Sequence, residues 1–476
     1  MEVNSEQISR LVEEVVKRVK SELDNKDKAV QLSGFSSSDG IFSSLDDAIR
    51  HAEKSQEFLL SLGFEKRKEI ISSMRKYAIE NAEYLAEFAH RETGLGRVKD
   101  KVAKNLLAAK KTPGCEDLES KTYTGDDGLT LVEMAPYGVI GSITPTTNPS
   151  STIINNSISM VAAGNAVVFN PHPSAKGVSN ETVRILNRAI RAAGGPETLL
   201  CSISEPTLET SKALMKHPKI KMLVVTGGGE VVKAAMASGK KVIAAGPGNP
   251  PVIVDETANI KNAAKHIVDG ASFDNCVLCI AEKEVFAVSK IVDELKEEMK
   301  KNGAYEINSR QADELVKVLF KDTNREHPVT NKKFVGKDAR LILEQIGIHV
   351  GPEIRLVITE VDENHPFVYT EMLMPVLPIV RVRDVDEAIE KAVRAENGCR
   401  HTAIMHSENV VNMTKAARAL NTTIFVKNAP SYAGLGFGGE GFTTLTIAGP
   451  TGEGLTSARS FTRQRRCVLK DSFRII

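Results

Sequence analysis

The chain has 476 residues, which is too many for one ordinary hydrophobic core and predicts two or three domains. Hydrophobic residues make up 41% and charged residues 26%, a balance that is typical of soluble globular proteins. Because 62 Lys and Arg nearly cancel 61 Asp and Glu, the chain has no overall electrostatic field that would attract nucleic acid. No apolar run approaches the roughly 20 residues that are needed to cross a bilayer. We therefore expect neither a nucleic-acid partner nor a membrane.

Residues 1–23 predict a separate amphipathic helix, and residues 24–44, rich in Ser, Gly and charged residues, predict a flexible linker. A short helix on a tether is typical of a docking element, and packing on its own subunit or a neighbour is the alternative. The segment lacks a basic region followed by an apolar core, so it is not a secretory signal. The apolar residues at three- and four-residue spacing are Ile8, Leu11, Val12, Val15, Val16 and Val19.

The apolar residues of 45–110 recur at helical spacing, which predicts helices, and a parallel α/β pattern follows. Five apolar strands then alternate with four helices, which predicts an open Rossmann-type sheet that binds ligands at the carboxyl ends of its strands. A second α/β region runs from residue 252 to about residue 447, and a tail that is basic and then apolar follows it. In the first region we expect strands at 137–143, 166–169, 199–203, 222–225 and 241–245, and helices at 150–163, 174–193, 207–215 and 231–237.

The segment SFDNCVLCIAEK, residues 272–283, places Cys276 and Cys279 in a polar turn. Such a pair suits a redox disulfide, half of a metal site, a catalytic thiol, or two small buried residues. A metal needs further ligands, and no second cysteine pair or histidine-rich stretch follows at a suitable distance, so we expect no metal. The six cysteines as a whole, without regular spacing, fit free thiols in a reducing cytosol.

Seven segments in their order and spacing carry a much more specific signal than the cysteine pair. They are ITPTTNP (143–149), VVTGGG (224–229), AAGPGNPP (244–251), SFDNCVLCIAEK (272–283), HPFVYTEMLMP (365–375), GLGFGGEG (434–441) and PTGEG (450–454). With these segments the chain resembles the aldehyde dehydrogenase superfamily. It is most similar to the coenzyme A-acylating branch, which is found in bacterial microcompartments that process ethanolamine or 1,2-propanediol. The resemblance covers essentially the whole chain.

The resemblance implies an α/β fold of the aldehyde dehydrogenase type, with a Rossmann-type cofactor domain, a second α/β catalytic domain and a β oligomerisation arm. The strand around residues 130–134 and the tail look like that arm, so we expect a homodimer or homotetramer. The expected division is a targeting helix at 1–23, a linker at 24–44, a cofactor domain at 45–250 (with 120–135 contributing to the arm), a catalytic thiol domain at 251–447, and a return segment and tail at 448–476.

The resemblance also implies a nucleophile and an oxyanion site. Cys279 matches the family's nucleophile, which adds to an aldehyde carbonyl and becomes a thioester after hydride loss, while Cys276 falls where relatives need no thiol. We expect the site to lower the pKa of the Cys279 thiol from its usual value of about 8.5. Asn148, with the Cys279 N–H, matches the pair of donors for the developing alkoxide, although an ordinary Asn-Pro turn is the alternative.

One departure from the family pattern bears on the product. Hydrolytic relatives carry a Glu that activates water, and Ala245 stands at that place here. Without such a base the thioester should wait for a better nucleophile, the thiol of coenzyme A, unless another carboxylate reaches the site. The implied reaction is the reversible oxidation of acetaldehyde or propionaldehyde with NAD and coenzyme A to acyl-CoA and NADH. The rivals are a hydrolytic, acid-forming dehydrogenase and a shell-binding protein with a vestigial dehydrogenase body.

The expected cofactor residues lie in several of these segments. Thr226, Gly227, Gly228 and Gly229 follow a strand and open a helix, which suits a pyrophosphate. The matches to G-x-G-x-x-G within 434–441 lie outside a strand-to-helix unit and are chance. Asn170, Pro171 and His172 replace the family's Lys-Pro, which favours NAD over NADP, and His172 suits either a phosphate contact or a turn. The other expected contacts are Thr144, Pro145 and Thr146, Glu371 on the nicotinamide ribose, and Leu373 near it.

The remaining expectations concern place and partners. His401 and His406 flank a strand-like run and are interpreted as structural. The resemblance implies a cytoplasmic protein inside a bacterial microcompartment, with the helix at 1–23 docking on shell or core proteins.

Overall fold

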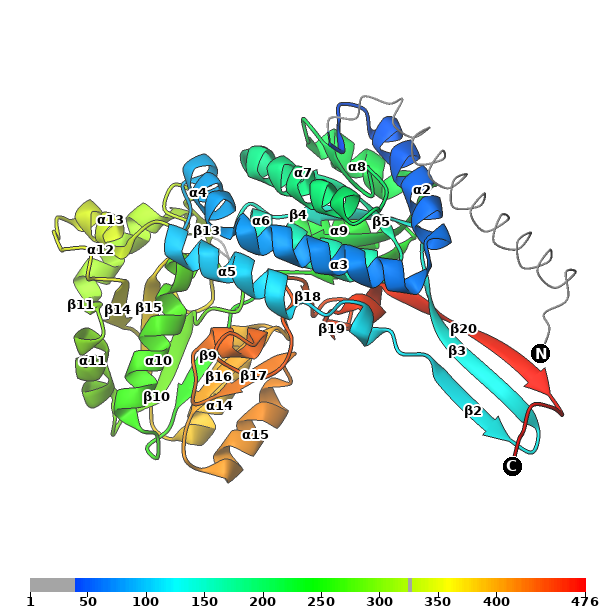
Figure 1. Ribbon diagram of the computed structural model, residues 1–476. Coiled ribbons are helices and arrows are strands. Elements are labelled where there is room, and N and C mark those ends of the chain that lie inside the picture. Colours follow the sequence, from blue (N-terminus) through cyan, green and yellow to red (C-terminus); the bar gives the residue numbers. More distant parts are fainter. Residues whose placement is uncertain (1–38, 324–327) are drawn as a thin grey trace, which may run out of the picture.

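The computed structural model describes residues 39–323 and 328–476, which form two α/β lobes and a long β arm (Figure 1). The amphipathic helix expected at 1–23 lies outside the described residues, as does most of the expected linker. Among the described residues, no helix is both long and apolar enough to span a bilayer.

The end of the expected linker needs a correction. Ile41–Phe42 forms strand β1, which pairs in parallel with β6 (Leu200–Ile203). The Ser44 hydroxyl then accepts a hydrogen bond from the Asp47 N–H at 3.3 Å and caps the first long helix. Backbone pairing and a helix cap therefore order the chain before residue 45.

The first lobe is built on a six-stranded parallel sheet in the order β1-β6-β5-β4-β7-β8. The chain runs from β4 to β5 and β6 on one side and then crosses to β7 on the other, so β4 and β7 flank a topological switch point. Every strand and helix expected between residues 137 and 245 is present, with ends within two residues of the expected ones. The elements are α2 Leu45–Ser61, α3 Gly63–Glu80, α4 Ala82–Thr93, α5 Val98–Lys111, β4 Val139–Thr144, α6 Pro149–Ala162, β5 Ala166–Pro171, α7 Lys176–Ala192, β6, α8 Leu208–Lys216, β7 Ile220–Thr226, α9 Gly229–Met236 and β8 Lys241–Ala245.

The second lobe contains a seven-stranded parallel sheet in the order β11-β14-β15-β10-β9-β16-β17 and a hydrophobic core of its own. The chain enters it directly, because only five residues separate β8 from β9. Its principal elements are β9 Pro251–Val254, α10 Ile260–Ser272, β10 Glu284–Val288, α11 Val292–Lys301, β11 Ala304–Ile307, α12 Ser309–Leu319, α13 Ala339–Leu343, β14 Leu356–Glu360, β15 Val376–Val382, α14 Val385–Glu396, β16 Thr402–His406, α15 Val410–Leu420 and β17 Ile424–Lys427.

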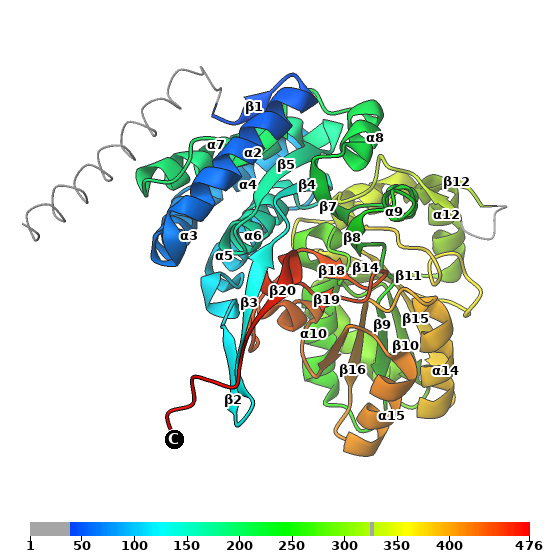
Figure 2. The ribbon, with the colours of Figure 1, turned by 90° about the vertical axis from the view of Figure 1, so that its right-hand side faces the viewer.

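A three-stranded antiparallel sheet projects away from both lobes as the arm (Figures 1 and 2). Its central strand is β3 (Gly128–Pro136), flanked by β2 (Lys121–Gly125) and by β20 (Thr462–Lys470) from the tail. The tail and the strand around residues 130–134, both expected in the arm, therefore pair with each other in it. Short pairs of strands complete the chain: β12 Phe320–Asp322 with β13 Val329–Thr330, and β18 Ile447–Ala448 with β19 Gly454–Leu455.

Helix α5 is the element that joins the lobes at the site. It packs against α6 of the first lobe and against the segment Phe273–Cys276 of the second, and Figure 1 shows it running between the two. Because α6 follows the loop of Asn148 and Phe273–Cys276 precedes Cys279, one helix contacts both expected halves of the oxyanion site.

Candidate active site

The loop that carries Cys279 has an unusual backbone. Helix α10 ends at Ser272, and a short 3-10 segment follows in which Asp274, Asn275 and Cys276 have φ of 47°, 53° and 64°. Asp and Asn tolerate this left-handed conformation better than other non-glycine residues, because their short polar side chains make local hydrogen bonds. Three consecutive residues of this kind turn the chain sharply and place Cys279 at the end of a buried loop.

Lys283 organises this loop from within. Its buried Nζ donates hydrogen bonds to the carbonyl oxygens of Leu278 and Ala281, both at 3.0 Å, and contacts the Cys276 sulfur at 3.4 Å. Cys276 is buried, whereas Cys279 is partly exposed. Of the two thiols, only that of Cys279 is open to a substrate, which supports the prediction that Cys279 is the nucleophile.

The expected lowering of the Cys279 pKa is wrong for the free chain. Burial and then the negative charge of Glu371 raise the pKa of this thiol to about 12. Lys283 and the backbone N–H groups of Cys279 and Ile280 act in the opposite direction, but they do not compensate for the loss of solvent. The resting nucleophile is therefore a protonated thiol.

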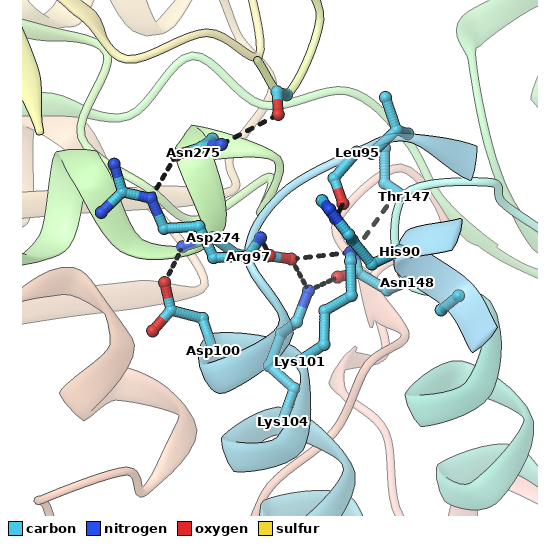
Figure 3. Close-up of polar contacts among 12 residues, drawn as sticks. His90, Leu95, Arg97, Asp100, Lys101, Lys104, Thr147, Asn148, Asp274 and Asn275 are labelled. Atoms are coloured by element: carbon cyan, nitrogen blue, oxygen red, sulfur yellow. Dashed lines mark hydrogen bonds and ion pairs between the residues drawn. The ribbon is translucent and has the colours of Figure 1, made fainter. Parts of the chain in front are cut away.

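Asn148 lies buried at the end of the loop between β4 and α6, where it precedes the first residue of the helix. Its side chain makes no cap hydrogen bond to α6, although Asn is a common cap. Instead its amide oxygen accepts a hydrogen bond from the Nζ of Lys104, on α5 (Figure 3). The same Nζ pairs with the carboxylate of Asp274, and burial lowers the pKa of Lys104 to about 8.

Gly248 connects the Ala245 segment to the nucleophile. Its N–H donates to Glu371 Oε1 at 3.3 Å, and a Cβ built on it would lie 2.9 Å from the Cys279 carbonyl oxygen and 3.0 Å from the His401 ring. Only glycine fits this approach. Glu371 and His401 therefore lie beside the nucleophile loop, and Ala245, at the end of β8, presents a methyl group rather than a carboxylate.

His401 was interpreted as structural, and the structure gives the protonation state and the contacts of its ring. Burial, with Lys283 adding to it, lowers the pKa of His401 to about 4, so the imidazole is neutral. Its Nδ1 contacts the Thr402 hydroxyl at 2.8 Å, and in the described part of the chain its buried Nε2 has no partner. His401 is therefore a neutral, buried side chain that packs beside the nucleophile loop.

The expected cofactor residues of the first lobe meet at the carboxyl edge of its sheet. Thr144 ends β4 and Thr226 ends the adjacent β7, while Pro145 and Thr146 are half-buried in the loop that follows β4. The Thr144 hydroxyl is buried without a hydrogen-bond partner among the described residues. A Cβ built on Gly227, Gly228 or Gly229 would meet no atom within 4 Å, so open space lies over the start of α9. Such a helix start, with free N–H groups, fits a pyrophosphate.

The same edge carries Asn170, Pro171 and His172. The side chains of Asn170 and His172 already make hydrogen bonds within the chain. The Asn170 amide donates to Ser211 Oγ and its oxygen accepts from Thr210 Oγ1, both at 2.7 Å, so this residue fastens α8 to the sheet. Nδ1 of the exposed His172 accepts from the Ser174 N–H at 3.1 Å, which is the turn alternative. Their cofactor contacts stay predictions.

Leu373 lies near Glu371 with a φ of 54°, a backbone conformation that is rare for leucine. Its carbonyl oxygen accepts a hydrogen bond from the Gly336 N–H at 2.9 Å, which holds the segment in place. Strained residues of this kind gather at ligand sites, and the contact expected for Leu373 stays a prediction.

A narrow, mostly apolar cavity lies between α5, the Cys279 loop and the segment that contains GLGFGGEG. The rings of Phe273, Tyr432 and Phe437 pack together there, with centroids 5.2 to 5.8 Å apart. Phe437 comes from the segment with the G-x-G-x-x-G matches, which forms turns rather than a strand-to-helix unit, as expected. The other lining residues are Ala103, Lys104, Leu107, Leu278, Leu435 and Leu445.

Lys104 and Asp274 were not expected in the site, and His401 was interpreted only as structural. The Asp-Asn pair at 274–275 carried a usable signal, because both residue types favour the left-handed region. Lys104 carried none, since a lysine on a helix normally indicates a solvated face. In the described part of the chain, no group of three His, Cys, Asp or Glu residues is arranged to hold a metal ion.

Comparison with known proteins agrees with this geometry. Residues 36–446 match the model of the aldehyde dehydrogenase family. The chain is 50% identical to an acetaldehyde dehydrogenase (acetylating) of Bilophila wadsworthia, over 100% of both chains. It is 48% identical to a propanal dehydrogenase (CoA-propanoylating) of Citrobacter freundii, over 92% of this chain and 94% of the relative.

Solved structures agree as well. One is a propionaldehyde dehydrogenase of Rhodopseudomonas palustris with bound CoA and an acylated cysteine, at a TM-score of 0.89 and 50% identity over 91% of this chain and 99% of that one. Another is a propionaldehyde dehydrogenase from the fucose utilisation microcompartment of Clostridium phytofermentans, at a TM-score of 0.90 and 50% identity over 92% and 100%. The expected fold class is confirmed, and the chain belongs to the aldehyde dehydrogenase family.

Proposed function

We propose that the chain oxidises a short aldehyde with NAD and coenzyme A to acyl-CoA and NADH, through a thioester on Cys279. The observation that carries the proposal is the site itself: an accessible thiol, a fixed amide donor in Asn148, and a methyl group at Ala245 where a water-activating carboxylate would stand. The relatives named as acetylating or CoA-propanoylating dehydrogenases support it.

The carboxyl edge of the first sheet fits NAD. The start of α9, the open space over Gly227 to Gly229 and the unpartnered hydroxyl of Thr144 would hold its phosphates. When bound, NAD accepts a hydride from the substrate carbon. The chain's own part is to place that carbon between this edge and Cys279.

In the first half-reaction the Cys279 sulfur bonds to the aldehyde carbon, the C=O double bond becomes C–O⁻, and the thiol proton passes to solvent. The amide N–H of Asn148 and the backbone N–H of Cys279 stabilise the negative oxygen. Loss of hydride restores the C=O bond and leaves an acyl thioester on Cys279.

In the second half-reaction the thiol of coenzyme A attacks this thioester. The coenzyme A thiol gives up its proton to solvent as its sulfur bonds to the acyl carbon. The bond between the acyl carbon and Cys279 then breaks, and the departing thiolate takes up a proton. Without a carboxylate at Ala245, water is not activated to compete.

Acetaldehyde and propionaldehyde are the proposed substrates. A short alkyl group would lie against the apolar residues Phe273, Leu278 and Tyr432, beside the loop that carries Cys279. Leu278 directly precedes the nucleophile, so a bulkier alkyl group would meet its side chain first.

The deciding experiment measures NADH formation from propionaldehyde with and without coenzyme A. We expect sustained turnover only with coenzyme A, a loss of at least about 10³-fold in Cys279→Ala, and activity retained in Cys276→Ala. Equal turnover without coenzyme A would instead return the chain to the hydrolytic class, and full activity of Cys279→Ala would remove the covalent mechanism.

The finer placement of the protein is also proposed. We infer that it works inside a bacterial microcompartment, with residues 1–23 docking on shell or core proteins, because a similar protein comes from such a compartment. We also infer a homodimer or homotetramer that assembles through the arm, whose outer strands β2 and β20 expose edges on both sides of β3.

A further inference from the structure

Two lysines on α5 are almost completely buried. The side chains of Lys101 and Lys104 lie one turn apart on the same face of the helix and are 3% and 4% exposed as residues. Lysine is rarely buried without a partner, because its ammonium group loses its hydration. Both reach Asp274, whose carboxylate is fully buried (Figure 3).

Asp274 links α5 to the nucleophile loop through four contacts. Its carboxylate accepts from the Arg97 N–H at 2.6 Å, from Lys101 Nζ at 3.1 Å and from Lys104 Nζ. Its own N–H donates to Asp100 Oδ2 at 2.8 Å. Because Asp274 begins the run of left-handed residues, these bonds hold the turn that places Cys279.

Lys104 differs from Lys101 in a second contact, to the amide oxygen of Asn148. An ammonium group can only donate, so it requires the oxygen of the amide to face it and the NH₂ group to face away. One hydrogen of that NH₂ group is directed to the Thr147 hydroxyl at 3.2 Å, which leaves the other for the substrate oxygen. No other hydrogen bond to the Asn148 amide oxygen occurs among the described residues.

We propose that Lys104 is a positioning residue of the reaction: it fixes the Asn148 amide with its N–H toward the substrate oxygen and, through Asp274, fixes that amide relative to the Cys279 loop. This proposal rests on the proposed function. Asn148 belongs to the first lobe and Asp274 to the second, so one ammonium group sets the geometry between the two donors of the oxyanion site. Without Lys104 the amide would be free to rotate and present its oxygen to a negative charge.

The test compares Lys104→Met with Lys101→Met. Both remove a buried charge that pairs with Asp274, but only the first removes the contact to Asn148. We expect Lys104→Met to lower the rate constant of NADH formation in a single turnover by roughly 10- to 100-fold, somewhat less than the loss of an entire oxyanion donor. The KM for propionaldehyde should change by less than about threefold, because the contact acts in the transition state. The loss in Lys101→Met should be clearly smaller, because Lys104 and the Arg97 N–H still hold Asp274 and the contact to Asn148 is kept.

A double-mutant cycle separates positioning from a structural role. In the Asn148→Ala background no amide remains to be oriented, so adding Lys104→Met should cost less than about twofold. Lys104→Gln, whose side-chain N–H can still donate to the Asn148 oxygen, should recover part of the rate. It also serves as the test variant if Lys104→Met does not fold.

Equal losses from Lys104→Met in the two backgrounds, or equal losses from Lys101→Met and Lys104→Met, would overturn the proposal. The wild-type chain and Cys279→Ala are measured in the same assay. Loss of the coenzyme A requirement there would refute the proposed function, whereas additive mutant effects with that requirement intact would refute only the role of Lys104.

Discussion

The chemistry of Cys279 is set by its neighbours rather than by the residue itself. Burial and Glu371 raise the pKa of its thiol, whereas Lys283 and two backbone N–H groups lower it. The balance leaves the pKa at about 12, so the nucleophile rests as a thiol and needs the bound state to become reactive. Such a resting thiol is also protected from oxidation, which acts on the thiolate.

This pKa predicts how the free thiol reacts. Far below the pKa, the thiolate fraction rises about tenfold per pH unit, so alkylation of Cys279 by iodoacetamide without cofactors should rise steadily from pH 6.5 to 9.5. In Glu371→Gln the rate at pH 8 should be higher, by roughly 3- to 10-fold, because the charge that raises the pKa is gone. The rate is followed by mass spectrometry of the Cys279 peptide, with Cys279→Ala as the background. A plateau of the wild-type rate below pH 9 would show that the thiol ionises in the neutral range.

At the scale of elements, the regular strands and helices were predictable and the nucleophile turn was not. Residues 137–245 alternate apolar strands with helices that turn and cap residues delimit, and that alternation located every element. The turn at 273–276 has no periodicity, because Asp274 is held by Arg97, which precedes α5, and by Asp100 and Lys101 on α5. Residues 170 or more positions apart in sequence make those bonds, and no local pattern reports them.

The element at 1–23 leads to a prediction that separates docking from catalysis. Deleting residues 1–23 should leave turnover in solution within about twofold of wild type, because the proposed site is built from residues 97 and beyond. Co-assembly with microcompartment shell proteins, measured by co-sedimentation after co-expression, should be lost.

A matched pair of substitutions sharpens that experiment. Leu11→Glu with Val15→Glu places charge on the apolar face of the expected helix, whereas Lys17→Glu changes charge on its polar face. Only the first should abolish co-assembly. Loss of turnover on deletion would mean that the segment belongs to the catalytic body.

At the scale of the whole molecule, the arm is the feature that a single chain does not explain. Tyr123, Thr130 and Val468 form one row across its three strands, and cross-strand partners point to the same face. Tyr123 is 59% and Val468 62% exposed, so this row offers an apolar surface on a sheet with two open edges.

We expect substitutions in this row of residues to weaken the oligomer. Tyr123→Glu with Val468→Glu should shift the protein toward monomer in sedimentation velocity, because two buried carboxylates would face each other across the interface. Thr124→Glu adds charge to the same strand on the opposite face and should have a much smaller effect. An unchanged oligomer in the double variant would place the interface elsewhere.

Taken by itself, the amino-acid sequence determined the α/β class, the order of elements in the first lobe, and the family. These features depend on hydrophobic period and on motifs of a few neighbouring residues, which are local. Only the tertiary structure decided that Lys104 faces Asn148 and Asp274, that Lys283 holds the loop of Cys279, that the neutral His401 packs beside it, and that the thiol pKa is raised rather than lowered. Those properties depend on burial and on charges brought together from distant parts of the chain, and desolvation exists only once the lobes have packed.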